Sequence, residues 1–484
     1  MGHHQTNTFE PNAENFTFGG RLKTLCLVFM GLGVLGLIWS FLGSEEGTKH
    51  SRFWTNLLTN AYYFNGIAIA AMFLVSVLTI GYGAWQTLIK RIFESFGVYV
   101  WVTLVCFVLI IIAMKTGATN LYELWLHPVA GDTIVGDKIN FLNFGMYTGG
   151  VLFFFAGWIG IGAYMRSHSL AEDGAADAVA HYQKSKYIAA AYIVLFGVSS
   201  SIFSWWAIMS LDPHWYSTMF GWYNFASYMC GMLSMMILII SYLKYKGHLR
   251  NVTENHLHDL GMFLFGFSVF WTYVWFSQFM LIWYGNIPED TMYFVKRFDV
   301  PLFKWLFLGT FFINFVFAFL FLLKRSAKRQ FLTAGFASAV LIIGHYMDFY
   351  LMVAPEPNKI ENHGGNHHAT EAKGHSLNVS SDRVLLANAE PTGHEAAKTE
   401  AHGDAHAAAT HEGHADVKAA HGAGHHGAHH EEPPLTHASM GLIEIMIFLG
   451  FFGSFLFIVL TRLSKNRLVP INHPMLEESL RHNI

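Results

Sequence analysis

Residues 331–353 read FLTAGFASAVLIIGHYMDFYLMV, an apolar run that contains one imidazole, His345, and one carboxylate, Asp348. A helix needs about 20 apolar residues to cross a hydrocarbon core of roughly 30 Å, so this run is long enough to span a bilayer. Ionisable side chains inside such a run are costly and are usually functional. The run therefore predicts a membrane helix and indicates where function should be sought.

Nine other apolar runs of similar length accompany it. The chain is 53% hydrophobic and only 13% charged, which is too apolar for a water-soluble domain with an ordinary charged surface. Alternating patterns typical of a barrel are absent, so each run must satisfy its backbone as a helix. We predict an all-α polytopic membrane protein with ten transmembrane helices, at residues 22–42, 61–84, 93–113, 141–164, 187–209, 218–243, 259–284, 302–323, 331–353 and 440–460.

Lysine and arginine are distributed unevenly among the loops. The N-terminus, the even-numbered loops and the C-terminal tail hold 18 of them, the short odd-numbered loops hold seven, and the long ninth loop holds five. Because cytoplasmic loops collect these residues, both termini are predicted to be cytoplasmic. The expected order is a cytoplasmic segment, a nine-helix membrane domain, a loop on the opposite side, a tenth helix and a cytoplasmic tail, at 1–20, 21–353, 354–438, 439–461 and 462–484.

The ninth loop, residues 354–438, carries 15 of the 28 histidines among Ala, Gly, Glu and Asp, with almost no large apolar side chains. This composition is typical of a disordered segment. Its clustered imidazoles could bind Zn or Cu loosely, for example at His425, His426, His429 and His430. A solvated linker is the favoured interpretation, since the loop has neither Cys nor a regular ligand spacing.

The three cysteines, Cys26, Cys106 and Cys230, all fall within predicted spans. They cannot frame a disulfide fold or group as ligands of an iron–sulfur cluster. No CxxCH run occurs, and His345 is the only histidine deep in a span, so a di-haem cytochrome b is not expected. We therefore expect no cofactor bound by this chain, and any electron carriers belong to partner subunits or to a quinone.

His345 and Asp348 lie three residues apart, so they share one face of a helix and could exchange a proton. The alternative is a hydrogen-bonded pair that locks two helices together. Four further groups lie at a similar depth or just outside it: Asp212, His214, Glu444 and Lys115, although Lys115 could simply extend to the membrane interface. These groups could form an outward half-channel, although Glu444 could instead face lipid headgroups.

On the cytoplasmic side, His258 and Asp259 precede the seventh predicted span. Asp259 is placed to cap the exposed amides of that helix, and this is the favoured interpretation. A proton entrance is the alternative, because an imidazole beside a carboxylate exchanges protons readily near neutral pH.

Aromatic side chains are concentrated on the fifth and seventh spans. They could stack against a quinone ring or line its tail, or they could belong to the belts at the membrane interface. The candidates are Trp205, Trp206, Trp271, Trp275, Phe276 and Trp283.

Two motifs carry a resemblance to a known family. Residues 210–218 read SLDPHWYST, and a second pattern runs from His258 and Asp259 through FSQ at 276–278 to WYGNIPE at 283–289. Both are similar to the second large membrane subunit of alternative complex III, in the NrfD or polysulfide-reductase membrane-subunit family. The resemblance implies two four-helix bundles, at 61–209 and 218–353, with one peripheral helix at each end.

The resemblance also implies a function, in a quinol-oxidising respiratory complex of the bacterial inner membrane, with the His-rich loop periplasmic. Its expected partners are a homologous quinol-binding membrane subunit, an iron–sulfur subunit, and multihaem and monohaem cytochrome c subunits, with lipids and the quinone pool around them and no nucleic acid. The haem c and iron–sulfur clusters would lie in those partners. Asp212, His214, His258 and Asp259 fall within the motifs, whereas His345 and Asp348 are chosen by depth alone. Proton conduction and scaffolding are the roles we expect, with quinone contact possible.

Two other classes remain open. Ten spans, two similar halves and polar groups in the midplane also occur in secondary transporters, which should show broken helices in corresponding spans. A passive scaffold would bind neither quinone nor protons.

Overall fold

The computed structural model describes residues 16–43, 49–129, 131–355 and 440–482. Within these ranges the regular structure is entirely helical, and ten helices are long and apolar enough to cross a membrane. The prediction of an all-α multi-pass membrane protein is confirmed. Nearly all of the His-rich loop, and with it the suggested Zn or Cu ligands, lies outside the described residues.

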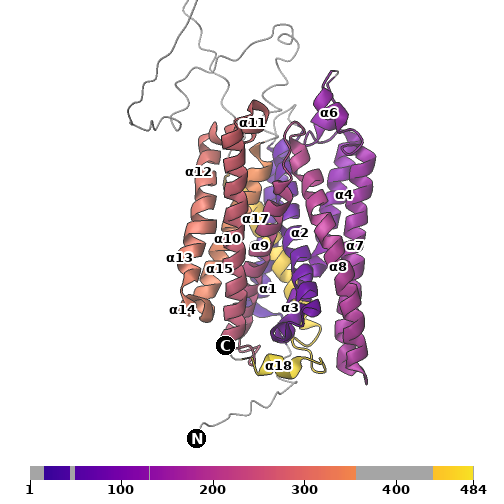
Figure 1. Cartoon of the computed structure of the whole chain (residues 1–484), viewed down its shortest axis with the longest axis vertical. Helices are drawn as coiled ribbons and strands as arrows, with labels where there is room; N and C mark the ends of the chain where they lie inside the picture. Colours follow the sequence, from indigo (N-terminus) through magenta and orange to yellow (C-terminus); the bar gives the residue numbers. More distant parts are fainter. Residues whose placement is uncertain (1–15, 44–48, 130, 356–439, 483–484) are drawn as a thin grey trace, which may run out of the picture. The chain divides into compact units, whose positions relative to one another are not determined.

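The ten spans are formed by single helices or by helical segments in series (Figure 1). They are α1 (Gly20–Leu42), α2 (Ser51–Ile80), α3 (Lys90–Phe96) with η3 (Gly97–Tyr99) and α4 (Val100–Thr116), α7 (Phe144–Ala171), α8 (Ala178–Ala207), α9 (Met219–Tyr245), α10 (Glu254–Gly285), α12 (Pro301–Phe311) with the π-helical η6 (Phe312–Phe317) and α13 (Ala318–Leu323), α15 (Phe331–Val353) and α17 (Leu442–Ser464).

Short helices lie between the spans. They are η2 (Ala84–Leu88), α5 (Glu123–Leu126), α6 (Thr133–Asp137), η4 (Glu172–Gly174), η5 (Met209–Leu211), α11 (Pro288–Phe298), α14 (Arg325–Arg329) and α18 (Leu476–Leu480). Figure 1 shows α6 and α11 at one end of the helices and α14 and α18 at the other. We call these the α11 end and the α18 end.

Several helices begin earlier than hydropathy predicts. The second span starts at Ser51 rather than at residue 61, because Asn56 and Asn60 are buried against neighbouring helices although they are polar. The seventh span starts at Glu254 rather than at residue 259, because Thr253 and His256 form a capping box at its beginning. A hydropathy count excludes such residues from a span, because it cannot distinguish polar side chains that face protein from polar side chains in a loop.

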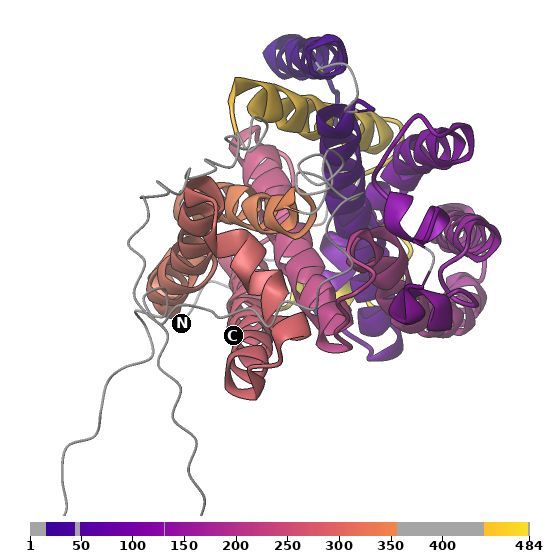
Figure 2. The same ribbon diagram turned by 90° about the horizontal axis from the view of Figure 1, so that it is seen from above.

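The membrane spans form two groups of helices. α2, α4, α7 and α8 pack together, as do α9, α10, α12, α13 and α15, and α2 meets α9 and α15 between the two groups. The first and tenth spans pack on each other rather than standing apart (Figure 2). A Cβ on Gly33 would lie 2.4 Å from the Gly450 Cα, so the α1 and α17 backbones are in direct contact there.

Candidate functional site

His345 and Asp348 both face protein. α15 packs against α9 and α12, and the exposed fractions of the two side chains are 0% and 2%. Asp348 lies near the α11 end of the protein. The distance along the helix axis from Asp348 to the last residue of α15, Val353, is about 7 Å. The prediction that protein shelters this pair from lipid tails is confirmed.

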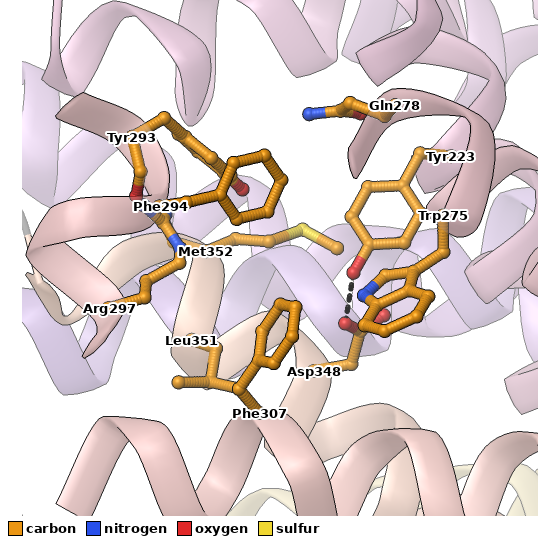
Figure 3. A pocket seen from close by; sticks show the side chains of 10 residues that line it. All are labelled: Tyr223, Trp275, Gln278, Tyr293, Phe294, Arg297, Phe307, Asp348, Leu351 and Met352. Atoms are coloured by element: carbon orange, nitrogen blue, oxygen red, sulfur yellow. Dashed lines mark hydrogen bonds between the residues drawn. The ribbon is translucent and has the colours of Figure 1, made fainter. Parts of the chain in front are cut away.

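Three side chains donate hydrogen bonds to the Asp348 carboxylate. Trp271 Nε1 on α10 donates at 3.0 Å and Ser227 Oγ on α9 at 2.8 Å, both to Oδ2. The Tyr223 hydroxyl donates to Oδ1, as the dashed line in Figure 3 marks. Because α9, α10 and α15 each contribute, the acid is held by a three-helix junction.

Ser227 also connects Asp348 to His345. Its Oγ lies 3.3 Å from His345 Nδ1 while it donates to Asp348 Oδ2. The hydroxyl can donate only once, so its bond to Asp348 leaves it to accept from a protonated Nδ1. The imidazole and the carboxylate are therefore coupled through a hydroxyl rather than directly. Within the described ranges His345 Nε2 has no hydrogen-bond partner.

A small cavity lies against Asp348 (Figure 3). Its volume open to water is about 20 Å³, room for about one water molecule. A quinone ring does not fit in a space of this size. The lining residues are Tyr223, Trp275, Gln278, Tyr293, Phe294, Arg297, Phe307, Asp348, Leu351 and Met352.

Arg297 places a positive charge on the wall of this cavity. It lies in the last turn of α11, is 2% exposed, and its Nη1 donates to the Tyr293 carbonyl at 2.6 Å. Its guanidinium carbon lies 3.4 Å from the centroid of the Tyr293 ring. A cation and an acid thus border the same cavity.

A second, smaller cavity of about 10 Å³ continues toward Asp212. Tyr293 and Met352 line both cavities, so the cavity beside Asp348 and the cavity beside Asp212 are neighbours. Asp212 and Asp348 therefore lie in one region of the protein, and the outward half-channel stays a prediction.

Asp212 and His214 belong to a charged network at the α11 end. Lys296 donates to Asp212 Oδ2, and His214 Nε2 lies 2.7 Å from Asp132 Oδ2. Burial raises the pKa of Asp132, but the Val135 amide and the His214 imidazole outweigh it and leave that pKa below its usual value. This network reaches the exposed surface, since His214 is exposed.

Replacing Asp212 with Asn tests whether this network carries protons or only holds the loops. We expect proton translocation to fall about tenfold with the protein still assembled, because an amide cannot exchange a proton with water in the second cavity. Vesicle proton-flux assays normalised to assembled protein provide the measurement. Loss of the assembled protein itself would instead identify Asp212 as a structural joint with Lys296.

Glu444 has a different environment from the one predicted. Its carboxylate accepts from Arg52 Nε at 2.7 Å and Nη2 at 2.8 Å, and from the Gly441 amide at 2.8 Å. The side chain is 1% exposed, so the alternative that it faces lipid headgroups is wrong. Asn56 Nδ2 adds a fourth bond at 3.2 Å. The pair joins α17 to α2 and does not line the Asp348 cavity.

His258 and Asp259 lie at the opposite, α18 end. Asp259 does not cap α10, because that helix begins five residues earlier at the Thr253 cap, so the capping prediction is wrong. Its Oδ2 lies 2.8 Å from His482 Nε2 in the C-terminal tail, and its Oδ1 lies 3.7 Å from His258 Nδ1. The carboxylate ties the tail to α10.

The aromatic candidates do not form one cluster. Trp271 donates to Asp348, and Trp275 lines the cavity with its ring 5.9 Å from that of Trp271. Trp206 is buried in the other helix group, where its Nε1 donates to the Phe141 carbonyl, and Trp205 is half-buried beside it in α8. Two members of the set lie on the exposed surface: Phe276 and Trp283.

Further polar side chains continue from His345 toward the α18 end. Asn314, in the π-helical segment, is fully buried with neither side-chain atom bonded in the described structure, and it packs where Gly344 leaves space. Ser234 and Ser338 are likewise buried with hydroxyls that lack a partner among described residues. Buried polar groups of this kind usually bind ordered water, and π-segments frequently mark functional sites.

Sequence reasoning missed Tyr223, Ser227 and Arg297. Tyr223 and Ser227 are four residues apart on a predicted span, which places them on one face, but nothing in the sequence says which helix they meet. Arg297 belongs to a helix that lies between two predicted spans, and Pro288 at its first turn and basic residues at its last are typical helix signals.

Fold and site together define a multi-pass helical membrane protein with a buried acid–hydroxyl–imidazole unit. The chain matches no known protein-family model and no characterised protein. Among the described residues no group of three or more His, Cys, Asp or Glu side chains is arranged to hold a metal ion.

Proposed function

We propose that this chain is the proton-conducting and scaffolding membrane subunit of a respiratory quinol:electron-acceptor oxidoreductase of the alternative complex III type. The observation that carries the proton role is the Asp348–Ser227–His345 unit, buried within the membrane spans beside a water-sized cavity. The observation that carries the complex is the pair of motifs at 210–218 and 258–289.

Proton transfer in this proposal begins at the cavity. Asp348 releases its proton to water there, and the resulting carboxylate takes the proton of Ser227 Oγ while Ser227 accepts a proton from His345 Nδ1. A proton arriving at His345 Nε2 from the α18 side replaces the one that Nδ1 has given up. Tyr223 and Trp271 hold the carboxylate in place during the exchange. Arg297 disfavours the entry of metal cations by repulsion.

The route has one half on each side of this unit. Toward the α11 end, the second cavity leads to Asp212 and the exposed His214. Toward the α18 end, Asn314, Ser234 and Ser338 supply polar groups that water can join. We place the α18 end in the cytoplasm and the His-rich loop in the periplasm of a bacterial inner membrane, on the lysine and arginine distribution.

No step is assigned to a quinone in this chain, because the Asp348 cavity is too small for its ring. Quinol oxidation is assigned to the related membrane subunit, and electrons pass to haem c and iron–sulfur clusters held by partner subunits. The aromatic side chains near Asp348 then serve to exclude lipid and to position the acid.

Blue-native electrophoresis of gently solubilised membranes tests the assignment to a complex. We expect this chain to comigrate with bands that stain for covalent haem and that carry an iron–sulfur signal. A chain that migrates alone contradicts the assignment and favours a transporter. The helices argue against that class, since the eighth span has a π-helical interruption whereas the corresponding fourth span, α7, is continuous.

A further inference from the structure

An apolar groove opens on the outward face of α10, near the α18 end. It is lined by Met262, Phe263, Gly266, Phe267 and Phe270 and has a volume of about 350 Å³. Gly266 creates the hollow, because an added Cβ there would meet no atom within 4 Å. The groove extends over little more than two helical turns, about 12 Å, and faces the hydrocarbon region.

A lysine without an acidic partner lies at the edge of this groove. Lys328, on α14, is 5% exposed, and its Nζ contacts the Met262 sulfur at 3.1 Å and lies 5.3 Å from the centroid of the Phe265 ring. No carboxylate of the described chain lies within 4.0 Å of this ammonium. Burial lowers the pKa of Lys328, as expected for a charge with so little polar contact.

The nearby acids are engaged elsewhere. Glu254 pairs with Arg329 at 3.4 Å, and Asp259 pairs with His482 at 2.8 Å. Lys324 and Arg325 add positive charge at the same end of the eighth span. The groove is therefore apolar along its length and cationic at the end where lipid headgroups lie.

We propose that this groove and Lys328 form a binding site for an anionic phospholipid. The lipid phosphate accepts a hydrogen bond from Lys328 Nζ, and an acyl chain fills the hollow at Gly266. A basic pocket beside membrane helices is a recurrent recognition site for anionic headgroups. A helix from a partner protein suits the site less well, since the groove is only about two turns long and a helix face would not supply the anion.

Native mass spectrometry of the full chain, purified in detergent and titrated with phosphatidylglycerol or phosphatidylcholine, tests the site. We expect phosphatidylglycerol to bind preferentially. Lys328→Met keeps the side-chain stem that packs on Gly261 but removes the charge, and should weaken phosphatidylglycerol binding about fivefold. Gly266→Leu places a side chain in the hollow, where an added Cβ meets no atom within 4 Å, and should weaken the binding of this lipid to a similar extent.

Two matched variants serve as controls. Lys465→Met removes an exposed charge at the same end, and Gly160→Leu adds a side chain at another open helical position with no atom within 4 Å. Both should bind phosphatidylglycerol like the unmodified chain. Equal binding of the two lipids would overturn the proposal. So would a Gly266→Leu variant with full affinity, because the ammonium alone would then account for binding.

Discussion

Replacing Asp348 with Asn should lower quinol-driven proton translocation about 100-fold while the protein remains folded and assembled. The amide has the same shape and can still accept hydrogen bonds from Ser227 and Trp271, but it cannot take up or release a proton at neutral pH. Positioned acid–base groups commonly contribute factors of about 10² to 10⁴. The measurement is proton movement across sealed membrane vesicles driven by quinol, normalised to assembled protein.

Two companion variants make this result specific. His345→Ala should have a similar effect, because it removes the imidazole that bonds to Ser227. Asp137→Asn changes an exposed carboxylate at the α11 end and should leave translocation unchanged. Normal translocation in Asp348→Asn would remove this residue from the pathway and support the passive scaffold.

Replacing Glu444 with Gln should destabilise the protein by about 3 kcal/mol, because it replaces the buried carboxylate that pairs with the Arg52 guanidinium by a neutral amide. Removing one partner of a buried ion pair typically costs about 3–5 kcal/mol. We expect the lower end because the Arg52 side chain is 25% exposed. Unfolding of the purified chain in mixed detergent micelles measures the change in free energy.

The control for this variant is Glu477→Gln. Glu477 pairs with Arg481 at 3.6 Å, but both side chains are more than 80% exposed, so its loss should change stability by less than about 0.5 kcal/mol. Equal stability of the two variants would mean that the Glu444–Arg52 pair does not hold α17 to α2. Proton translocation in Glu444→Gln should persist, since this pair does not line the Asp348 cavity.

The ten spans were predictable because each is a continuous apolar run, and hydropathy responds to composition alone. The first residues of the helices were harder to predict from the sequence. At the beginning of α2, Asn56 and Asn60 bond to backbone carbonyls one turn earlier and face neighbouring helices, so they look like loop residues in a hydropathy count. At α10 the capping residue is Thr253, six residues before the predicted apolar run begins at residue 259.

The sequence predicted the residues that α15 contributes to the candidate site but not the residues that other helices contribute. Three-residue spacing placed His345 and Asp348 on one face, and their cost in lipid indicated that this face is buried. The serine that couples them comes from α9, 118 residues from His345 in the chain, and no local pattern encodes that contact. The same holds for Arg52 and Glu444, which are 392 residues apart.

The α11 segment carries local helix signals in its sequence although it is too polar to be a membrane span. Pro288 at its start and Lys296 and Arg297 at its end favour a short helix. The resulting helix places Lys296 on Asp212 and Arg297 on the Asp348 cavity. A helix that lies outside the spans thus completes the α11 half of the proposed route.

Infrared difference spectroscopy tests most directly whether Asp348 exchanges protons with water. The full chain in detergent is stepped in pH, and the carboxyl bands of the unmodified protein and of Asp348→Asn are compared. Our mechanism predicts a pair of bands, from the protonated and ionised forms of one carboxyl group, that is present in the unmodified protein and missing from the variant. Identical spectra from the two proteins would contradict it.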